Sequence, residues 1–380
     1  MRDWVIKVLG EIISRNAVNP AHSGPGEKER ADYIQNLLEN MGLKTKRYEV
    51  IDNKGIVRPS IVTEIGEGKT IWLIAHIDTV SPGSGWTKDP FKLTIEGGKV
   101  FGRGVNDNGI GIMAALIVLK KIVDEKIELR YKLKVGFVAD EEAGSTYGLK
   151  HLVNEGVFSR GDRAIIPDAG NEEGTMVEIA EKAILWLKFI TKGKQTHGST
   201  PHRGDNAFLK SMRMANELYD TLHEKFSDSD ELFDPPVSTF EPTMKDKNTD
   251  SINIIPGEDV HYWDCRILPQ HNLEDVLEII DRVSKKYDTE VEVVMKEEAS
   301  RVEPEDWIVV KLTNSIRKVL GKEPKLMGIG GGTFASILRK IGVPSVVWHI
   351  GSGTEHQPDE WELLSNYFKN AEVLLDVLTT

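Results

Sequence analysis

Histidine, aspartate and glutamate residues follow five separate apolar stretches of this 380-residue chain. They are His76 after TIWLIA, Asp107 in FGRGVNDNG, Glu142 after KVGFVADE, Asp168 after AIIP and His356 downstream of PSVVW. Imidazole and carboxylate groups suit zinc, manganese or cobalt better than calcium or a thiolate-seeking metal. Two histidines and three carboxylates are too many for one tetrahedral zinc, but they suit two metal ions that share one carboxylate. The pattern therefore predicts a two-metal hydrolase.

The first 180 residues alternate helical and strand patterns. Helical spacing of apolar residues predicts helices at 1–16, 26–42 and 109–123, and short apolar runs predict strands at 71–76, 133–139 and 163–167. These runs carry few charges and little alternation, which is typical of strands buried on both faces under covering helices. Ligands of such sheets gather at the carboxyl ends of the strands. His76, Glu142 and Asp168 stand at or just after such ends.

The pattern changes over residues 181–298, where strands and helices follow an approximate β-α-β-β-α-β order. From about residue 300 the first pattern returns, with helices at 304–320, 332–341 and 360–378 and a strand at VPSVVW. A chain of this length exceeds what one core usually supports. We therefore expect an α/β catalytic domain from 1–180 and 299–380, with a mostly parallel central sheet flanked by helices. A ferredoxin-like α+β domain at 181–298 interrupts it.

Each candidate ligand also has an ordinary structural alternative. His76 and Asp78 point the same way on an extended strand, so Asp78 could orient a metal-binding imidazole or merely satisfy a buried histidine. Asp107 could instead be the N-cap of the following helix. The run Asp140–Glu142 could be a solvated acidic strand end. Alternatively, one carboxylate binds metal while its neighbour accepts a proton from water.

Composition excludes several classes of partner. A net charge of -12 argues against nucleic acid, because phosphate binding needs a surplus of Lys and Arg. The single cysteine, Cys265, allows neither an intrachain disulfide nor a thiolate cage, and we expect it to be a buried apolar residue. Lys7 and Glu11 interrupt the N-terminal apolar run, and no stretch approaches the ~20 apolar residues that span a bilayer. The chain is expected to be soluble and cytoplasmic.

The segments AHIDTV, GRGVNDNG, DEEAGS, PDAG and TEHQPDE together resemble the M20 family of metallopeptidases and deacylases, over nearly the whole chain. The resemblance implies that Asp107 bridges two metal ions. His76 and Asp168 would complete one metal site, and Glu142 and His356 the other. Asp78 would orient His76, and Glu141 would be the general base. The family's metal is typically zinc, with cobalt or manganese as alternatives.

The resemblance also assigns residues outside the metal centre. The inserted domain would be a lid that also forms a homodimer, and its His197 would stabilise the tetrahedral oxyanion, often in the partner subunit. Asn253 and Arg266 match positions that hold polar groups of the substrate, although Arg266 could equally form a strand salt bridge. Gly331, Gly332 and Thr333 align with a substrate-contact loop. Phe334 departs from the family, which often has aspartate there, and this affects the inferred specificity.

The expected substrate is an N-acyl amino acid, cleaved at its amide bond as in succinyl-diaminopimelate desuccinylase or acetylornithine deacetylase. A dipeptidase or carboxypeptidase of the same family, acting on short peptides, is the alternative. A protein that keeps the fold and binds metal without catalysis is the alternative from another class.

Overall fold

The computed structural model describes residues 1–380 as two compact units. The first unit consists of Met1–Ile179, Val302–Leu326 and Thr333–Thr380, and the second of Ala180–Arg301 and Met327–Gly332. The expected α/β class with an inserted α+β segment is confirmed. The second unit also takes in the short segment 327–332, which lies outside the expected insertion of residues 181–298.

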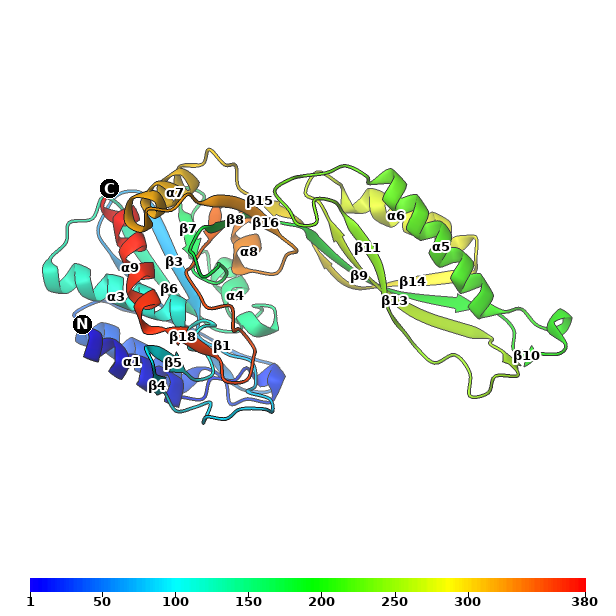
Figure 1. The fold of residues 1–380 in the computed structure, drawn as a ribbon, viewed down its shortest axis with the longest axis horizontal. Coiled ribbons are helices and arrows are strands. Elements are labelled where there is room, and N and C mark those ends of the chain that lie inside the picture. The colour runs from blue at the N-terminus through cyan, green and yellow to red at the C-terminus, as the bar shows by residue number, and fades with distance from the viewer. The chain divides into compact units, whose positions relative to one another are not determined.

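The first unit is built on a sheet with the strand order β1-β2-β6-β3-β7-β17-β8 (Figure 1). Its strands are β1 (Thr45–Ile51), β2 (Val57–Ile65), β3 (Thr70–His76), β6 (Lys132–Val138), β7 (Arg163–Ile166), β8 (Met176–Glu181) and β17 (Ser345–Val347). The four central strands β6, β3, β7 and β17 are parallel. The hairpin β1–β2 and strand β8 add antiparallel edges. The central sheet is thus mostly parallel, as predicted.

Helices cover both faces of this sheet. They are α1 (Arg2–Ser14), α2 (Lys28–Asn40), α3 (Gly109–Glu125), α4 (Leu149–Asn154), α7 (Trp307–Leu320), α8 (Phe334–Lys340) and α9 (Leu364–Thr379). Trp72 and Ile74 of β3 point to one face, where α4 and α8 complete the core. Ala75 points to the other face and lies beside Gly111 of α3. Because α3 is apolar on nearly all sides, it is buried beneath α1 and α9.

Short elements complete the first unit near the ends of the central strands. A small sheet has the order β18-β5-β4, formed by Trp361–Leu363, Lys99–Phe101 and Thr94–Glu96. Single 3-10 turns are η1 (Pro20–His22) and η2 (Glu141–Ala143). The turn η2 begins shortly after β6 and carries the predicted base Glu141 and the predicted metal ligand Glu142.

The second unit has a four-stranded antiparallel sheet of order β11-β13-β9-β14, with two helices packed on one face (Figure 1). In chain order the elements are β9 (Ala183–Lys192), α5 (Ala207–Lys225), β11 (Thr239–Lys245), β13 (Glu258–Ile267), α6 (Leu273–Lys285) and β14 (Thr289–Glu297). This is the predicted β-α-β-β-α-β order. Inward-facing residues of β13 include Cys265, which is buried in the core.

Four short strands and one turn belong to or enter the second unit. The strand β10 (Thr196–His197) pairs with β12 (Ile254–Ile255), and the turn η3 (Pro201–Arg203) follows β10. The strand β15 (Ser300–Arg301) pairs with the last residues of β8, and β16 (Lys325–Ile329) leads into the unit's second segment. None of the helices in the structure has both the length and the apolar character needed to cross a membrane.

Candidate metal centre

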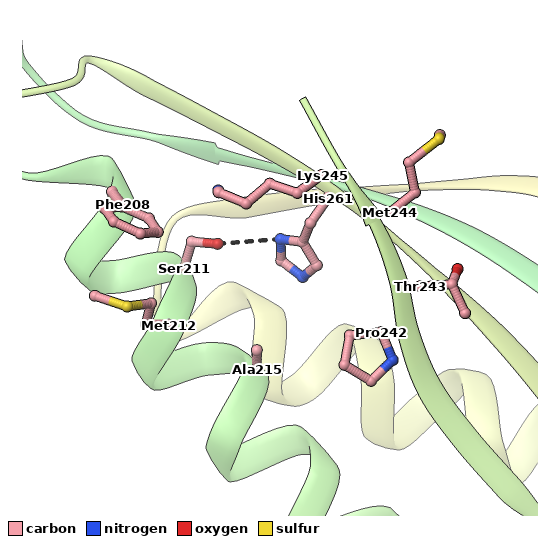
Figure 2. Close-up of a pocket in the computed structure, with 9 residues that line it drawn as sticks. All are labelled: Phe208, Ser211, Met212, Ala215, Pro242, Thr243, Met244, Lys245 and His261. Atoms are coloured by element: carbon pink, nitrogen blue, oxygen red, sulfur yellow. Dashed lines mark hydrogen bonds between the residues drawn. The ribbon is translucent and has the colours of Figure 1, made fainter. Parts of the chain in front are cut away.

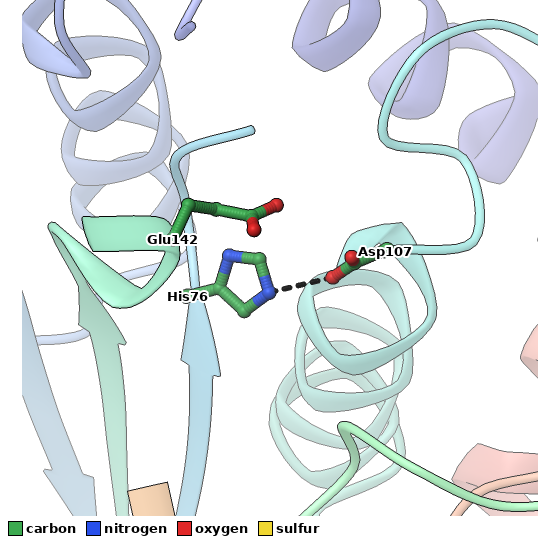
Figure 3. A group of neighbouring side chains, drawn as sticks. All are labelled: His76, Asp107 and Glu142. Carbon is green, nitrogen blue, oxygen red and sulfur yellow. Dashed lines mark hydrogen bonds and ion pairs between the residues drawn. The ribbon is translucent and has the colours of Figure 1, made fainter. Parts of the chain in front are cut away.

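Three segments of the first unit place His76, Asp107 and Glu142 around one point (Figure 3). His76 is the last residue of β3, Asp107 lies in the loop before α3, and Glu142 lies in η2 after β6. One ligand atom from each residue lies within 4.8 Å of the others. The convergence follows from the parallel pairing of β3 and β6, which brings their carboxyl ends side by side.

Asp107 stands at the middle of this cluster. Its Oδ1 lies 2.7 Å from His76 Nε2, and its Oδ2 lies 3.0 Å from His356 Nε2. The carboxylate is not the N-cap of α3. That position belongs to Asn108, whose side chain accepts a hydrogen bond from Gly111 N–H at 2.9 Å. Because the Asp107 side chain does not cap the helix, its two carboxylate oxygens can face the histidines on either side.

The remaining predicted ligands divide into two groups on either side of Asp107. His76 Nε2 lies 3.3 Å from Asp168 Oδ1, and His356 Nε2 lies 3.3 Å from Glu142 Oε2. Donor atoms around a tetrahedral zinc with bonds of about 2.0–2.2 Å are separated by roughly 3.3–3.5 Å. Both groups approach this spacing, and their chemistry is that of a zinc-type site. The residues present would fit two divalent cations, one held by His76, Asp107 and Asp168 and the other by Asp107, Glu142 and His356.

Electrostatics of the metal-free chain support the same conclusion. Hydrogen bonds to Asp107 and then to Glu142 raise the pKa of His356 to about 10. Burial alone would lower the pKa of His76, but Asp107 and Asp168 outweigh it and raise that pKa well above its usual value. Burial would raise the pKa of Asp107, but the two histidines hold it below its ordinary value. The carboxylates of the cluster thus favour positive charge at both histidine positions.

Asp78 and Glu141 lie directly beside these ligands. His76 Nδ1 is 3.1 Å from the backbone carbonyl oxygen of Asp78 and 3.4 Å from its Oδ1, so both fix the ring with Nε2 toward Asp107. Asp78 also accepts hydrogen bonds from the backbone N–H groups of Glu141 and Glu142, each at 3.1 Å. Burial and then the charge of Asp168 raise the pKa of Glu141 well above its ordinary value.

Sequence reasoning missed Glu360, a fully buried carboxylate that organises the loop carrying Asp107. It accepts hydrogen bonds from the backbone N–H groups of Gly104, Asn106 and Asp107 at 2.8–3.0 Å and pairs with Arg103 at 2.6 Å. Burial raises its pKa to about 7, against the opposing effect of Arg103. It follows the TEHQPD run, but its partners lie far away in sequence, so no local pattern predicted this role.

The second unit brings His197 and Asn253 together. His197 pairs with Ile254 in the β10–β12 ladder, and Gly198 N–H donates to the carbonyl oxygen of Asn253 at 2.7 Å. His197 is exposed, and its Nδ1 accepts the backbone N–H of Ser199 at 3.1 Å. An Nδ1 that accepts this hydrogen bond leaves Nε2 as the ring nitrogen that can donate one.

Arg266 forms the salt bridge that the sequence left as an alternative. Its Nε and Nη2 donate to the carboxylate of Asp264 at 2.7 and 3.1 Å, and its Nη1 donates to Gly330 O at 2.9 Å. Three of the five N–H groups of a guanidinium are thereby used. Arg266 thus contacts Gly330, the residue immediately before the predicted substrate loop.

The remaining residues of the predicted substrate loop are constrained by a hydrogen bond, by backbone conformation and by a helix cap. Gly332 N–H donates to Glu181 Oε2 at 2.8 Å. Gly331 has a φ of +110°, where a side chain would also meet Lys182 O. Thr333 caps α8 by accepting the N–H of Ala335 at 3.1 Å. Phe334, which stands where the M20 family often has aspartate, is buried and lies edge-on to His76, with 6.3 Å between ring centroids.

The chain belongs to the peptidase family M20/M25/M40, whose model matches residues 72–380. This membership, together with the cluster of His76, Asp107 and Glu142, identifies the protein as a metal-dependent hydrolase that acts on amide bonds. It is 42% identical, over 98% of both chains, to an uncharacterized metallohydrolase of Methanocaldococcus jannaschii. It is 25% identical, over the full length of both, to succinyl-diaminopimelate desuccinylase of Wolinella succinogenes. A tripeptidase from Staphylococcus aureus has a similar fold, with a TM-score of 0.79, 18% identity and coverage of 100% and 98%.

Proposed function

We propose that this protein hydrolyses the amide bond of an N-acyl amino acid, with a free carboxylate beside the cleaved bond. The observation that carries the proposal is the position of Asp107 between His76 and His356, at 2.7 and 3.0 Å, with Glu141 next to the ligand Glu142. The relatives named as desuccinylases support this substrate class.

The five ligands would hold two divalent cations, which we propose to be zinc, with cobalt or manganese as alternatives. When bound, such ions act as Lewis acids that acidify water and polarise an amide carbonyl. Asp107 would lie between them, His76 and Asp168 on one side, and Glu142 and His356 on the other. Asp78 would keep the His76 ring in its binding orientation.

Glu141 would move the proton. Its raised pKa, due to burial and to Asp168, favours proton uptake by this carboxylate. It would accept the proton of the attacking water and deliver it to the leaving amine. The exposed Nε2–H of His197 would donate a hydrogen bond to the oxyanion. Asn253, Arg266, Gly331, Gly332 and Thr333 would contact the substrate, and the Arg266–Asp264 pair would then share its guanidinium with the substrate carboxylate.

We also propose that the protein is a homodimer formed through residues 181–298. Strand β11 is an edge strand, and exposed apolar side chains of α5 and β11 surround a pocket of about 280 Å³ (Figure 2). Phe208, Met212 and Met244 line its outer part and are 37%, 43% and 54% exposed. An edge strand beside an apolar surface is a common site of association. The proposed location is the cytoplasm.

A substrate panel tests the function. The metal-free protein is reloaded with zinc, cobalt or manganese and assayed against N-succinyl and N-acetyl amino acids, dipeptides and tripeptides. The proposal predicts hydrolysis of N-acyl amino acids that the Glu141→Gln variant, prepared in parallel, does not show. Hydrolysis of peptides alone would make the protein a dipeptidase or carboxypeptidase. Tight metal binding without hydrolysis of any substrate would favour the non-catalytic alternative.

A further inference from the structure

A buried network of charged and amide side chains lies directly behind Glu141 and Glu142. Asp78 is its first member. This fully buried residue accepts the N–H of Glu141 on Oδ1 and the N–H of Glu142 on Oδ2, each at 3.1 Å. Asp78 therefore fixes the backbone of both the proposed base and a proposed ligand, in addition to its contact with His76.

Asn19 connects Asp78 to Asp140. Its side-chain amide donates to Asp78 Oδ2 at 2.8 Å and to Asp140 Oδ1 at 3.1 Å. The residue is fully buried, and its own Oδ1 accepts the N–H of Ala21 at 2.9 Å. Its backbone N–H donates to Thr79 O at 2.9 Å, just beyond β3. One neutral amide group thus joins two buried carboxylates that would otherwise repel each other.

Arg58 supplies the positive charge of the network. Its Nη2 donates to Asp140 Oδ1 at 3.1 Å, while its Nε and Nη2 form a two-point pair with Glu27. The side chains of Arg58 and Glu27 are 2% and 0% exposed. A planar guanidinium holds two carboxylates in fixed directions, which a lysine ammonium does not.

Asp140 transmits this geometry to the metal centre. Its φ of 64° lies in the left-handed region, which is unfavourable for a residue with a side chain. Hydrogen bonds hold it there: Oδ2 accepts the N–H of Tyr147 at 2.9 Å, and its carbonyl accepts the N–H of Ser145 at 2.6 Å. This turn redirects the chain from the end of β6 into η2, so that Glu141 and Glu142 follow at once.

We infer that Asn19 and Arg58 are positioning residues of the metal centre: they hold Asp78 and Asp140, and through them the direction in which Glu141 and Glu142 are presented. The inference rests on the proposed roles of Glu141 and Glu142. Residues that orient ligands in this way typically change metal affinity or activity by about 10–100-fold when they are replaced.

The test compares Asn19→Leu and Arg58→Met with wild type. Asn19→Leu keeps the approximate volume and removes the bridging amide. The dissociation constant for zinc is measured by competition with a chromophoric chelator, and unfolding temperature is measured on the same samples. We expect zinc to bind about 10–100-fold more weakly in each variant. For a substrate found in the panel, kcat falls while KM changes little, because the base is misplaced and the substrate contacts remain.

Arg339→Met is the matched control. Arg339 donates from Nη1 and Nη2 to the two oxygens of Glu178 at 2.9 and 2.8 Å, with side-chain exposures of 2% and 0%. Its loss is expected to lower the unfolding temperature as Arg58→Met does, but to leave zinc affinity at the wild-type value. Where Arg58→Met does not fold, Arg58→Lys keeps the positive charge but loses the planar guanidinium. Asn19→Ser keeps a single hydroxyl in place of the amide. Both variants are expected to weaken zinc binding.

The inference is wrong if folded Asn19 and Arg58 variants bind zinc with wild-type affinity and lose only unfolding temperature, as the control does. Its failure is distinct from failure of the proposed function. If the wild-type protein hydrolyses nothing in the panel, the proposed function fails, yet weaker zinc binding in the variants still supports the positioning role.

Discussion

His356 Nε2 lies 3.0 Å from Asp107 Oδ2, although the two residues come from opposite ends of the chain. The contact exists because the chain returns to the first unit after residue 301 and extends its parallel sheet with β17. It makes Asp107 the common member of the two proposed ligand groups, and the first prediction follows from that position.

Asp107→Asn is expected to abolish binding of at least one metal ion, because an amide offers one oxygen where a carboxylate offers two. His356→Ala should remove only the ion on the Glu142 side, since His76 and Asp168 remain. Metal content per chain is measured by elemental analysis after dialysis. His223→Ala, which alters a half-buried histidine of α5 in the second unit, serves as the control and should retain both ions. An Asp107→Asn protein that still holds two ions would exclude the bridging role.

Glu141→Gln is expected to retain two metal ions and to lower kcat by about 10²–10⁴-fold, the usual contribution of a general acid–base. Glutamine preserves the size of the side chain but accepts no proton. The variant is compared with Glu155→Gln, which alters an exposed glutamate after α4. Turnover close to wild type in a metal-loaded Glu141→Gln sample would contradict the assignment of Glu141 as the base.

The metal-free protein should lose stability as pH rises from about 6.5 toward 10. The pKa of His356 is raised to about 10 by Asp107 and Glu142, so its stabilising contribution is complete below the unfolded value of 6.5 and is lost as pH rises through 10. Burial raises the pKa of Glu142, which acts in the same direction. Metal binding requires neutral histidines, so it should strengthen over the same range.

Thermal unfolding of chelator-treated and zinc-loaded protein at several pH values checks this expectation. The unfolding temperature of the metal-free form should fall with pH, and the increase caused by zinc should grow. The slope of the metal-free form should be smaller in His356→Gln. A zinc effect that shrinks as pH rises would show that protons and metal do not compete for these histidines.

His197→Ala and Glu141→Gln are expected to complement each other if His197 acts in the partner subunit. Each variant alone should be nearly inactive, whereas mixed dimers would contain one site with an intact base and an intact histidine. Light scattering establishes the oligomeric state, and the mixture is assayed after subunit exchange. A monomeric mass, or no recovery of activity in demonstrated mixed dimers, would remove the role of His197 in the partner's site.

Local sequence patterns predicted the elements that carry most ligands. Strand β3 and the second half of β6, Val135–Val138, are apolar runs because helices cover both of their faces, so they stand out from the rest of the chain. The hairpin β1–β2 was not predicted. Its strand β1 mixes charged and apolar residues at an exposed edge, where burial imposes no simple pattern.

The sequence alone supplied the candidate ligands His76, Asp107, Glu142, Asp168 and His356, because three of them follow the ends of apolar strands and all five lie in segments that resemble one metallopeptidase family. Tertiary structure decided how they are used. It made Asn108 rather than Asp107 the helix cap, and paired Arg266 with Asp264. It also placed Asn19 and Arg58 behind the metal centre, since hydrogen bonds between distant segments depend on chain topology and leave no periodic trace in the sequence.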